Sequence, residues 1–550
     1  MKIVQPTNQF DNIALIETDR YLHNSYSNFE DLIQTIKLAQ SYVNAKNILG
    51  PKHPVKKFQY NSELANEEIP FNGKCTEQVL EELTEIFEGS FRVQSKNSMF
   101  NLIPNPLIDT LASSILMQIH NNNAIMDSYG GKSILFEQKV SRCIGKLIAW
   151  DKACGISCNG GKVTMFYAIK FAIQRIEPKS PINGIPNDLV ILISGGAHYS
   201  IEHTCSLLGL GKKNCIRIPI ESNEGITSEK LKEVFEEQIK QGKRVAAIIS
   251  CGGTTIDFIH DSTKTIYETT QKIVKEHKLD YTPYLHLDSV IGWLWFTFLK
   301  TEKDEITALS DSEEITQKIS CVIRKLEKIS QYDSIGVDFH KNGLCPYSSS
   351  FFIGKDDTII SNDKLSEKYY GELRAFDYTI ENTRSSNGIA SAWTSIHRLG
   401  LTGYQDYLIS LYKSSKTISE ALNNNCLFNL IDNNSCGWEI LFTINFAALK
   451  DKMGIPYSYN AIAETFIQYI WNKVDEGYDI PNFSIVKNYG EWFGKKQNHA
   501  FIIYNMHRDV TPLTSKSIAE LIAEQAMLFE IEIINGNLIP SSQTLATPIK

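Results

Sequence analysis

The chain has 550 residues, of which 42% are hydrophobic and 21% are charged, and its formal net charge is -8. This length and composition are typical of a globular protein with about two to four domains. The chain contains no Lys/Arg run of the kind that binds nucleic acid, no apolar signal core near Met1 and no stretch of roughly 20 apolar residues that could span a membrane. We therefore expect a cytoplasmic protein that has neither a nucleic-acid partner nor a membrane partner.

The 11 cysteines are scattered along the chain. In a large protein without an apolar signal core, such cysteines indicate reduced thiols rather than a disulfide framework. Cys154 and Cys158 are the closest pair, but no second pair of ligands at matching spacing accompanies them. We therefore expect no bound zinc or other metal.

Residues 1–100 combine helix-like segments with irregular stretches such as "NILGPKHPVKK" and contain no catalytic pattern. This part of the chain is apolar in places, yet it has no strand pattern of its own. We predict that it forms an N-terminal helical segment that takes part in dimerisation. Beyond it, the spacing of apolar residues in "PLIDTLASSILMQIHNNN" and "SILFEQKVSRCIGKLIAW" predicts two amphipathic helices.

The centre of the chain contains short, continuously apolar runs, "LVILIS" at 189–194, "VAAIIS" at 245–250 and "YLHLD" at 284–288. A helix-like segment, "STKTIYETTQKIVKEHKL", separates the second run from the third. This alternation predicts a parallel sheet that is covered on both faces, with right-handed crossovers. We assign residues 101–414 to this large α/β domain.

The pattern changes after residue 415, where short strand-like runs, "WEILFTINFA" and "HAFIIYNM", mix with helical segments such as "SKSIAELIAEQAML". This mixture predicts a smaller α+β domain at residues 415–550.

Polar side chains follow several of the predicted strands. In an open α/β sheet, such residues face the crevice at the carboxyl ends of the strands. These residues are His198, Thr254, Thr255, Asp288, His340 and Lys341. In addition, a Gly-Gly turn in "GISCNGGKVTMFYAIKFAI" (155–173) opens a helix, and the backbone N–H groups at such a helix start suit a phosphate.

A lysine, a carboxylate, a flat ring and a phosphate cup are together the parts of a pyridoxal phosphate site. The lysine forms a Schiff base, and the carboxylate pairs with the pyridine nitrogen and keeps it protonated. An imidazole can cover one face of the ring, and the helix N-terminus takes the phosphate.

The same segments, in this order from about 101 to 404, resemble the motifs of the group II pyridoxal-phosphate-dependent amino acid decarboxylases, which include the glutamate, histidine and aromatic amino acid enzymes. "GISCNGGK" is similar to the glycine-rich phosphate turn of that family, and "AHYS" to the motif of the ring-stacking histidine. "GGTTIDFIHD" resembles the paired-threonine motif, "LHLDS" the His-x-Asp-Ala motif and "DSIGVDFHK" the motif of the Schiff-base lysine. "YTIENTRSSNGIASAWTSIHRLGLTGY" resembles the downstream Ser-Arg and Leu-Gly-x-x-Gly region.

The resemblance implies a role for each matching residue. Lys341 is the Schiff-base lysine, Asp288 the partner of the pyridine nitrogen, and His198 the ring-stacking and catalytic histidine. Gly161 and Lys162 lie on the phosphate turn, where Lys162 either pairs with the phosphate, which we favour, or points to solvent.

Other implied positions complete the site. His340 is expected beside the phosphate and Thr255 at the cofactor, whereas Ser289 replaces the usual alanine and either bonds the cofactor or fills space. The family also carries a catalytic tyrosine, which protonates the product carbon, on a loop between the lysine strand and the Ser-Arg motif. Tyr370 is our first choice for this proton donor, and Tyr369 is the second.

Some features leave alternatives open. Arg384 binds either a substrate carboxylate or a structural Asp, and Cys345 is expected to be a bystander near the site. "LLGLGKKN" (207–214) has part of a dinucleotide-binding fingerprint, but it follows a helix and lacks the third glycine, so it predicts a helix-ending turn.

The resemblance implies the fold of the fold type I pyridoxal-phosphate enzymes, with a mostly parallel seven-stranded sheet in the large domain, a small C-terminal α+β domain and an N-terminal helical segment. It also implies a homodimer and α-decarboxylation of an L-amino acid to its amine. The segments expected near the substrate side chain, "FNLIPNP" and "SCN", lack a cluster of Arg or Lys. We therefore favour a neutral apolar or aromatic amino acid. The alternatives are oxidative decarboxylation–deamination to an aldehyde and a binding protein that keeps the fold without catalysis.

Overall fold

The computed structural model describes residues 21–46, 48–55, 58–65, 67–359, 373–432, 434–449, 457–495 and 498–541. It divides into two compact units, Met1–Ser98 with Phe466–Asn482 and Met99–Thr465 with Phe483–Lys550. Within the described ranges, every helix is too short or too polar to cross a membrane.

The first unit contains helices and irregular chain. Its helical elements are α1 (Phe29–Ala45), α2 (Tyr60–Leu64), α3 (Thr76–Leu83), η3 (Thr84–Phe87) and the end of α17 (Tyr459–Asp475). An ion pair between Lys52 and Asp475 joins the two pieces of chain. The long helix α1 has no buried residue. Helix α1 therefore contributes little to a core, whereas α17 supplies buried apolar side chains, Phe466, Ile467, Ile470 and Val474.

The second unit is built around a seven-stranded sheet. Its strands are β1 (Cys154–Cys158), β2 (Leu189–Ser194), β3 (Cys215–Ile218), β4 (Arg244–Cys251), β5 (Tyr284–Asp288), β6 (Ser334–Asp338) and β7 (Ser350–Gly354). The strand order is β1-β7-β6-β5-β4-β2-β3. Only β7 runs antiparallel to its neighbours. The three apolar runs predicted as strands are β2, β4 and β5, and the prediction of a mostly parallel sheet is confirmed.

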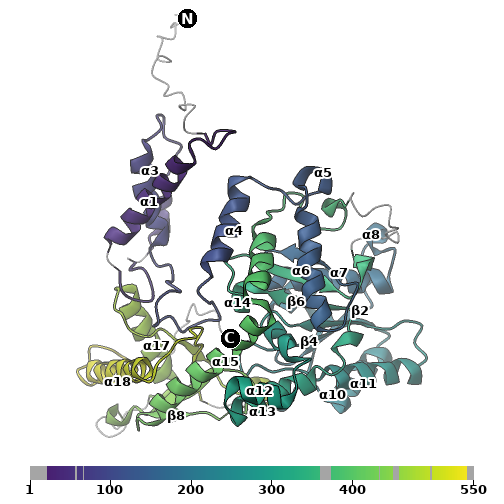
Figure 1. Ribbon diagram of the computed structural model, residues 1–550. Coiled ribbons are helices and arrows are strands. Elements are labelled where there is room, and N and C mark those ends of the chain that lie inside the picture. The colour runs from purple at the N-terminus through teal and green to yellow at the C-terminus, as the bar shows by residue number, and fades with distance from the viewer. Residues whose placement is uncertain are drawn as a thin grey trace, which may run out of the picture. The chain divides into compact units, whose positions relative to one another are not determined.

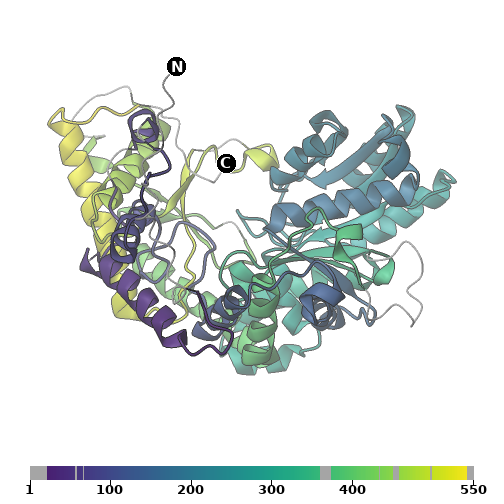
Figure 2. The same ribbon diagram turned by 90° about the horizontal axis from the view of Figure 1, so that it is seen from above.

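Helices cover both faces of this sheet (Figures 1 and 2). They are α4 (Ile108–Ile119), α5 (Asp127–Gly130), α6 (Ser133–Leu147), α7 (Gly161–Ile176), α8 (Ser180–Asn183), α9 (Ser200–Leu207), α10 (Ser228–Lys240), α11 (Thr263–Glu276), α12 (Lys303–Ser310), α13 (Glu313–Lys325), α14 (Phe339–Asn342) and α15 (Asn387–Asn423). Ile248 and Ile249 of β4 are neighbours in sequence but belong to different core clusters, as expected for a strand that is buried on both faces.

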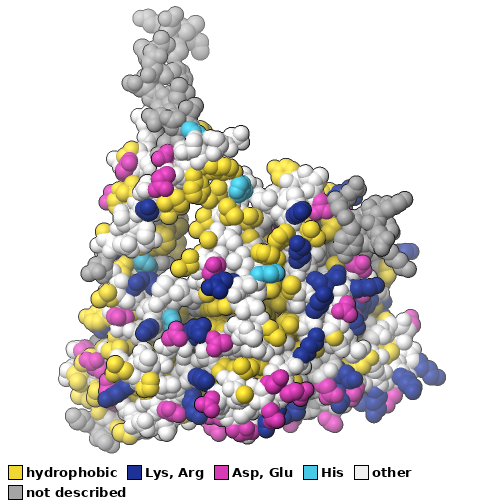
Figure 3. Space-filling model, in the orientation of Figure 1, with side chains coloured by type: hydrophobic (Ala, Val, Ile, Leu, Met, Phe, Trp, Pro, Cys, Tyr) yellow, Lys and Arg dark blue, Asp and Glu magenta, His cyan; other side chains and the backbone are white. Residues whose placement is uncertain are grey.

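Side-chain caps define where several of these helices begin. Thr227, Ser262 and Ser312 each accept a hydrogen bond from the third residue of the helix that follows, at the starts of α10, α11 and α13. On the outer surface of these helices, Lys and Arg intermingle with Asp and Glu (Figure 3), as in the ion pair between Lys232 and Glu276.

A second, antiparallel sheet belongs to the C-terminal part of the same unit. Its strands are β8 (Phe428–Leu430), β9 (Ile440–Ile444), β10 (Ser484–Val486) and β11 (Ala500–Ile503), in the order β10-β11-β9-β8, and the long helix α18 (Pro512–Ile534) follows them. The strand-like runs "WEILFTINFA" and "HAFIIYNM" contain β9 and β11. The predicted fold class, a parallel sheet combined with a smaller α+β element, is confirmed.

Candidate active site

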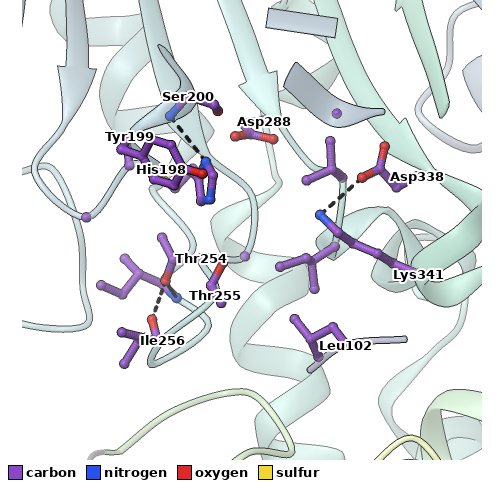
Figure 4. A pocket seen from close by; sticks show the side chains of 18 of the residues that line it. Leu102, His198, Tyr199, Ser200, Thr254, Thr255, Ile256, Asp288, Asp338 and Lys341 are labelled. Atoms are coloured by element: carbon purple, nitrogen blue, oxygen red, sulfur yellow. Dashed lines mark hydrogen bonds and ion pairs between the residues drawn. The ribbon is translucent and has the colours of Figure 1, made fainter. Parts of the chain in front are cut away.

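A cavity of about 360 Å³ lies at the carboxyl ends of the parallel strands (Figure 4). It lies where this class of sheet binds ligands, because the segments that leave parallel strands meet at one edge. The residues predicted from the sequence that line it are Gly161, Lys162, His198, Thr255, Asp288, His340 and Lys341. The structure thus brings together segments that are more than a hundred residues apart.

Lys341 lies on the short helix α14, which begins directly after strand β6. Its Nζ lies 3.1 Å from Oδ2 of Asp338, whose side chain is only 1% exposed. Burial opposes the ionisation of Asp338, but the charges of Lys341 and His340 outweigh burial and lower the pKa of the Asp338 carboxyl. The lysine amine is therefore held in the cavity by a buried carboxylate (Figure 4).

Sequence reasoning missed Asp338. A signal was present, because Asp338 ends β6 just as Asp288 ends β5, and it comes one helical turn before Lys341.

Asp288 ends strand β5 and points into the same cavity (Figure 4). Its Oδ1 is buried and accepts no hydrogen bond from the described residues. Burial raises the pKa of Asp288 to about 6, although the nearby Lys341 lowers it. A buried carboxylate oxygen that lacks a donor costs free energy unless a ligand supplies one.

His198 follows β2 and lines the cavity beside Tyr199. The Nδ1 of His198 accepts a hydrogen bond from the backbone N–H of Ser200 at 3.2 Å, and its ring centroid is 4.3 Å from that of Tyr199. These contacts orient a flat ring at the wall of the cavity, so the predicted stacking role fits its position.

The loop after β4 brings Thr255 to the cavity. Within this loop, the Oγ1 of Thr254 accepts a hydrogen bond from the N–H of Ile259 at 2.9 Å, so Thr254 stabilises the turn. The carbonyl oxygen of Thr255 accepts a hydrogen bond from the hydroxyl of Tyr504 at 2.6 Å. The Thr255 backbone is thereby fixed beside the cavity.

The start of helix α7 forms one end of the cavity. A Cβ added to Gly161 would lie 3.0 Å from Oδ2 of Asp338 and 3.0 Å from Cγ1 of Val290, so a side chain would crowd this turn. The preceding Gly160 has φ 96°, a conformation that favours glycine. The glycine pair therefore keeps the helix start open to a small anion.

Two basic side chains flank this helix start. The amine of Lys162 donates a hydrogen bond to Nδ1 of His203 on α9. His340 is buried, and its Nδ1 accepts a hydrogen bond from the N–H of Ser349 at 3.4 Å. Burial lowers the pKa of His340, although Asp338 raises it. Lys162 thus lines the cavity, as predicted, but it is paired with a histidine that sequence reasoning did not identify.

Of the predicted positions that the structure describes, Ser289 does not line the cavity. Ser289 is fully buried behind it, and its hydroxyl donates to the carbonyl oxygen of Gly336 at 2.7 Å. This bond joins neighbouring strands and favours the space-filling alternative. Tyr369 and Tyr370, the predicted proton donors, lie outside the described residues.

Arg384 is buried away from the cavity, where it forms an ion pair with Glu137. It also donates to the carbonyl oxygen of Ala124 at 3.1 Å and to the hydroxyl of Ser157 at 3.0 Å. Of the two alternatives drawn from the sequence, the structural one holds, but the partner is a glutamate rather than an aspartate. Cys345 is buried and does not line the cavity.

The turn at 207–214 ends a helix, as predicted. Helix α9 stops at Leu207, and Gly209 and Gly211 follow with φ values of 81° and 85°.

Comparison with known proteins identifies similar chains. Residues 59–298 match the family model described as "Pyridoxal-dependent decarboxylase conserved domain". A glutamate decarboxylase of Drosophila melanogaster is 23% identical over 296 residues, which cover 52% of this chain and 56% of that protein. An L-tyrosine decarboxylase of Levilactobacillus brevis is 23% identical over 232 residues, which cover 39% of this chain and 37% of that protein. The chain thus spans about half or less of the length of these curated relatives.

A solved structure described as Oryza sativa TDC with PLP and tryptamine has a TM-score of 0.71 to this structure at 13% identity. The match covers 92% of this chain and 99% of that chain, which shows a shared fold. These matches agree with the family resemblance and the cofactor that the sequence motifs indicated, and the shared fold confirms the predicted fold class.

The described residues also fit pyridoxal phosphate. The buried Oδ1 of Asp288 can accept a hydrogen bond from a protonated ring nitrogen. The open turn at Gly161 can take the phosphate, and Lys341 lines the same cavity.

Proposed function

Because residues 59–298 carry the conserved domain of the pyridoxal-dependent decarboxylases, we propose that this protein removes the α-carboxyl group of an L-amino acid as CO₂ and releases the amine. The observation that carries the proposal is the placement of Lys341, Asp288 and His198 around one cavity. A lysine for covalent attachment, a carboxylate with one oxygen open to a donor and a flat imidazole are the groups that this chemistry requires.

Each residue has a definite task in this proposal. Lys341 binds the cofactor covalently, and Asp288 holds a proton on the ring nitrogen. His198 covers one face of the ring, while the start of α7 and the side chain of His340 hold the phosphate. When bound, pyridoxal phosphate supplies a protonated ring that accepts the electron pair released as CO₂ leaves.

The substrate is, in our proposal, a neutral apolar or aromatic amino acid. Apolar side chains line part of the cavity, among them Leu102, Ile256 and Trp492. Two of the described lining residues, Lys162 and Lys341, carry an ammonium group. Lys162 is hydrogen-bonded to His203, and Lys341 forms an ion pair with Asp338. A carboxylate side chain would lose its hydration here without gaining a free cation in exchange.

The amine product needs a proton at the carbon that lost CO₂. We assign this proton to Tyr370, with Tyr369 as second choice, because a phenol can act as general acid. We further propose a homodimer in the cytoplasm. Exposed apolar side chains on α4, such as Ile108 at 84% and Leu116 at 47%, support a subunit contact.

The test is a screen of the twenty amino acids with cofactor-loaded protein, in which both CO₂ and amine are measured. We expect turnover with at least one aromatic or branched apolar substrate and none with Lys341→Ala. A preference for glutamate or aspartate would contradict the proposed substrate class, and the absence of amine with every substrate would contradict the proposed function.

A further inference from the structure

A short turn between β10 and β11 carries Trp492 to the cavity. This 3₁₀ turn, η10 (Glu491–Phe493), lies between two glycines in the left-handed conformation, Gly490 with φ 83° and Gly494 with φ 69°. A Cβ added to Gly490 would lie 2.7 Å from the carbonyl oxygen of Lys495. Both glycines are needed for the chain to turn so tightly, and the turn holds its tryptophan in a defined place.

The indole is tied to a buried carboxylate of the large domain. The Nε1–H of Trp492 donates to Oδ2 of Asp257 at 3.2 Å, and the hydroxyl of Tyr489 donates to Oδ1 at 2.9 Å. Asp257 is fully buried and has φ 63°, an uncommon conformation for a residue with a side chain. Charge-assisted hydrogen bonds of this kind are the stronger ones in proteins, so the carboxylate fixes both rings.

Asp257 also belongs to the loop that forms the cavity wall. Its neighbours in sequence, Thr255 and Ile256, line the cavity, as does Trp492 itself. The hydroxyl of Tyr504 bonds the carbonyl oxygen of Thr255 at 2.6 Å. Three side chains from the C-terminal sheet region therefore hold this wall in place: Tyr489, Trp492 and Tyr504.

The wall lies at the end of the cavity that the substrate side chain would occupy. In Figure 4, Asp288 lies at one end, and Leu102 and Ile256 lie at the other, with Lys341 between them. A cofactor whose ring nitrogen met Asp288 would leave the side of the cavity lined by Leu102 and Ile256 for the substrate side chain. Trp492 is linked to that end through Asp257, the residue after Ile256.

We propose that Trp492 determines substrate specificity by offering its indole to an aromatic substrate side chain, and that Asp257 is the residue that positions it. This inference rests on the proposed function and narrows its substrate class to aromatic amino acids. The indole N–H is already committed to Asp257, so the substrate meets an apolar ring surface. Stacked or edge-to-face aromatic pairs are favourable beyond the area that they bury.

The test compares two ligands that share an ethylamine chain and differ in the apolar group that it carries, an aromatic phenyl ring or a smaller aliphatic isopropyl group. Phenethylamine and 3-methylbutylamine are titrated into cofactor-loaded protein, and binding is followed by the cofactor absorbance. Trp492→Ala should weaken phenethylamine binding about 10-fold, an effect of the size expected for a lost aromatic contact, and change 3-methylbutylamine binding by less than about 3-fold. Trp492→Phe should keep most of the preference, because an aromatic ring remains.

The positioning role of Asp257 is tested by comparing how its substitution changes KM and how it changes kcat. Asp257→Ala should raise KM for the aromatic substrate with a smaller change in kcat, and Asp257→Asn, which still accepts one hydrogen bond, should partly restore KM. Trp393→Phe is the matched control, because this partly buried indole on α15 does not line the cavity.

The outcomes are separable. Equal weakening of both amines in Trp492→Ala, or unchanged binding of both, would overturn the role of Trp492. If the wild-type protein decarboxylates no amino acid, the proposed function fails, but the amine titration still decides whether Trp492 selects aromatic ligands. If Asp257→Ala does not fold, the positioning role is tested with Asp257→Asn alone. A folded Asp257→Asn protein that binds phenethylamine as tightly as the wild type would contradict this role.

Discussion

The side-chain nitrogen of Lys341 lies 3.1 Å from the carboxylate of Asp338, and Asp338 is almost completely buried. The two residues are one helical turn apart, because Asp338 ends strand β6 and Lys341 lies on helix α14, which follows it directly. The ion pair therefore forms within one short segment of the chain. The lysine that is proposed to bind the cofactor therefore also compensates a buried negative charge.

Lys341→Ala should abolish covalent attachment of the cofactor and also lower stability. Without the ammonium, Asp338 loses its cationic neighbour, because burial lowers the pKa of His340 and keeps that imidazole neutral at neutral pH. We expect a loss of about 2 kcal/mol, less than for a fully buried pair because Lys341 is partly exposed. Borohydride trapping and urea unfolding at neutral pH measure the two effects. The double variant Lys341→Ala/Asp338→Asn should regain stability but not trapping. Cofactor still fixed by borohydride in Lys341→Ala would show that another residue binds it.

Asp288→Asn should weaken cofactor binding by about 30-fold or more. The amide cannot supply the negative charge that a protonated ring nitrogen requires, and removing one partner of a buried charge pair typically costs about 2–5 kcal/mol. Equilibrium dialysis of the cofactor gives the affinity directly. Ser289→Ala is the matched control, because this neighbouring hydroxyl bonds Gly336 instead of lining the cavity. Equal affinities of wild type and Asp288→Asn would contradict the assignment.

Arg384→Met should unfold more easily than the wild type by about 3–5 kcal/mol, because it leaves Glu137 as an uncompensated buried charge. The double variant Arg384→Met/Glu137→Gln should recover much of this loss. Urea unfolding measures both. A variant with normal stability and a strongly raised KM would instead indicate that Arg384 binds the substrate carboxylate.

Glu439→Gln should change how stability depends on pH. Burial raises the pKa of Glu439 to about 7, with a contribution from Asp257. The folded state therefore holds a proton that the unfolded state releases near pH 4.5. This contribution to stability is complete below about pH 4.5 and is lost as the pH rises to about 7, by at most about 3 kcal/mol.

The glutamine variant stays neutral, so it should be more stable than the wild type at pH 8 and similar at pH 5. Denaturant unfolding across this range, with the exposed Glu420→Gln as control, gives the difference. A constant difference between wild type and Glu439→Gln at all pH values would rule out titration of this group.

Tyr370→Phe should slow amine formation and raise the yield of aldehyde, ammonia and peroxide, because the phenol no longer delivers its proton. Tyr369→Phe and the double variant identify the donor if the neighbour takes over. The three products are assayed together under air. Wild-type amine rate and yield in all three variants would place the donor elsewhere, with His198 as the next candidate.

Much of the sheet and of the cofactor pocket could be predicted because their signals are local. Strands such as β2 and β4 are buried on both faces, so they appear in the sequence as unbroken apolar runs. The polar residues after them, such as His198 and Thr255, then fall at the edge where the strands end. Chain order and this geometric rule placed these residues at one edge of the sheet, and the resemblance to the decarboxylase motifs implied their roles.

The parts that could not be predicted depend on distant pairings. Ser289 adjoins a predicted site residue, but the register of β5 against β6 turns its hydroxyl toward Gly336. The link between Asp257 and Trp492 joins positions 235 residues apart in sequence. Asp257 lies within the quoted paired-threonine motif, but no motif marks Trp492 as its partner. Such pairings depend on how the two sheets pack against each other. A short stretch of sequence carries no information about that packing.

Strand β1 has a consequence for the synthesis of the chain. Its strand partner in the sheet is β7, so Cys154–Cys158 forms its strand-to-strand hydrogen bonds only after Ser350–Gly354 has been synthesised. At roughly 5–20 residues per second on the ribosome, this wait lasts about 10–40 s. During that time an apolar strand and the glycine turn behind it remain unpaired in the nascent chain, which makes this segment a natural target for chaperones.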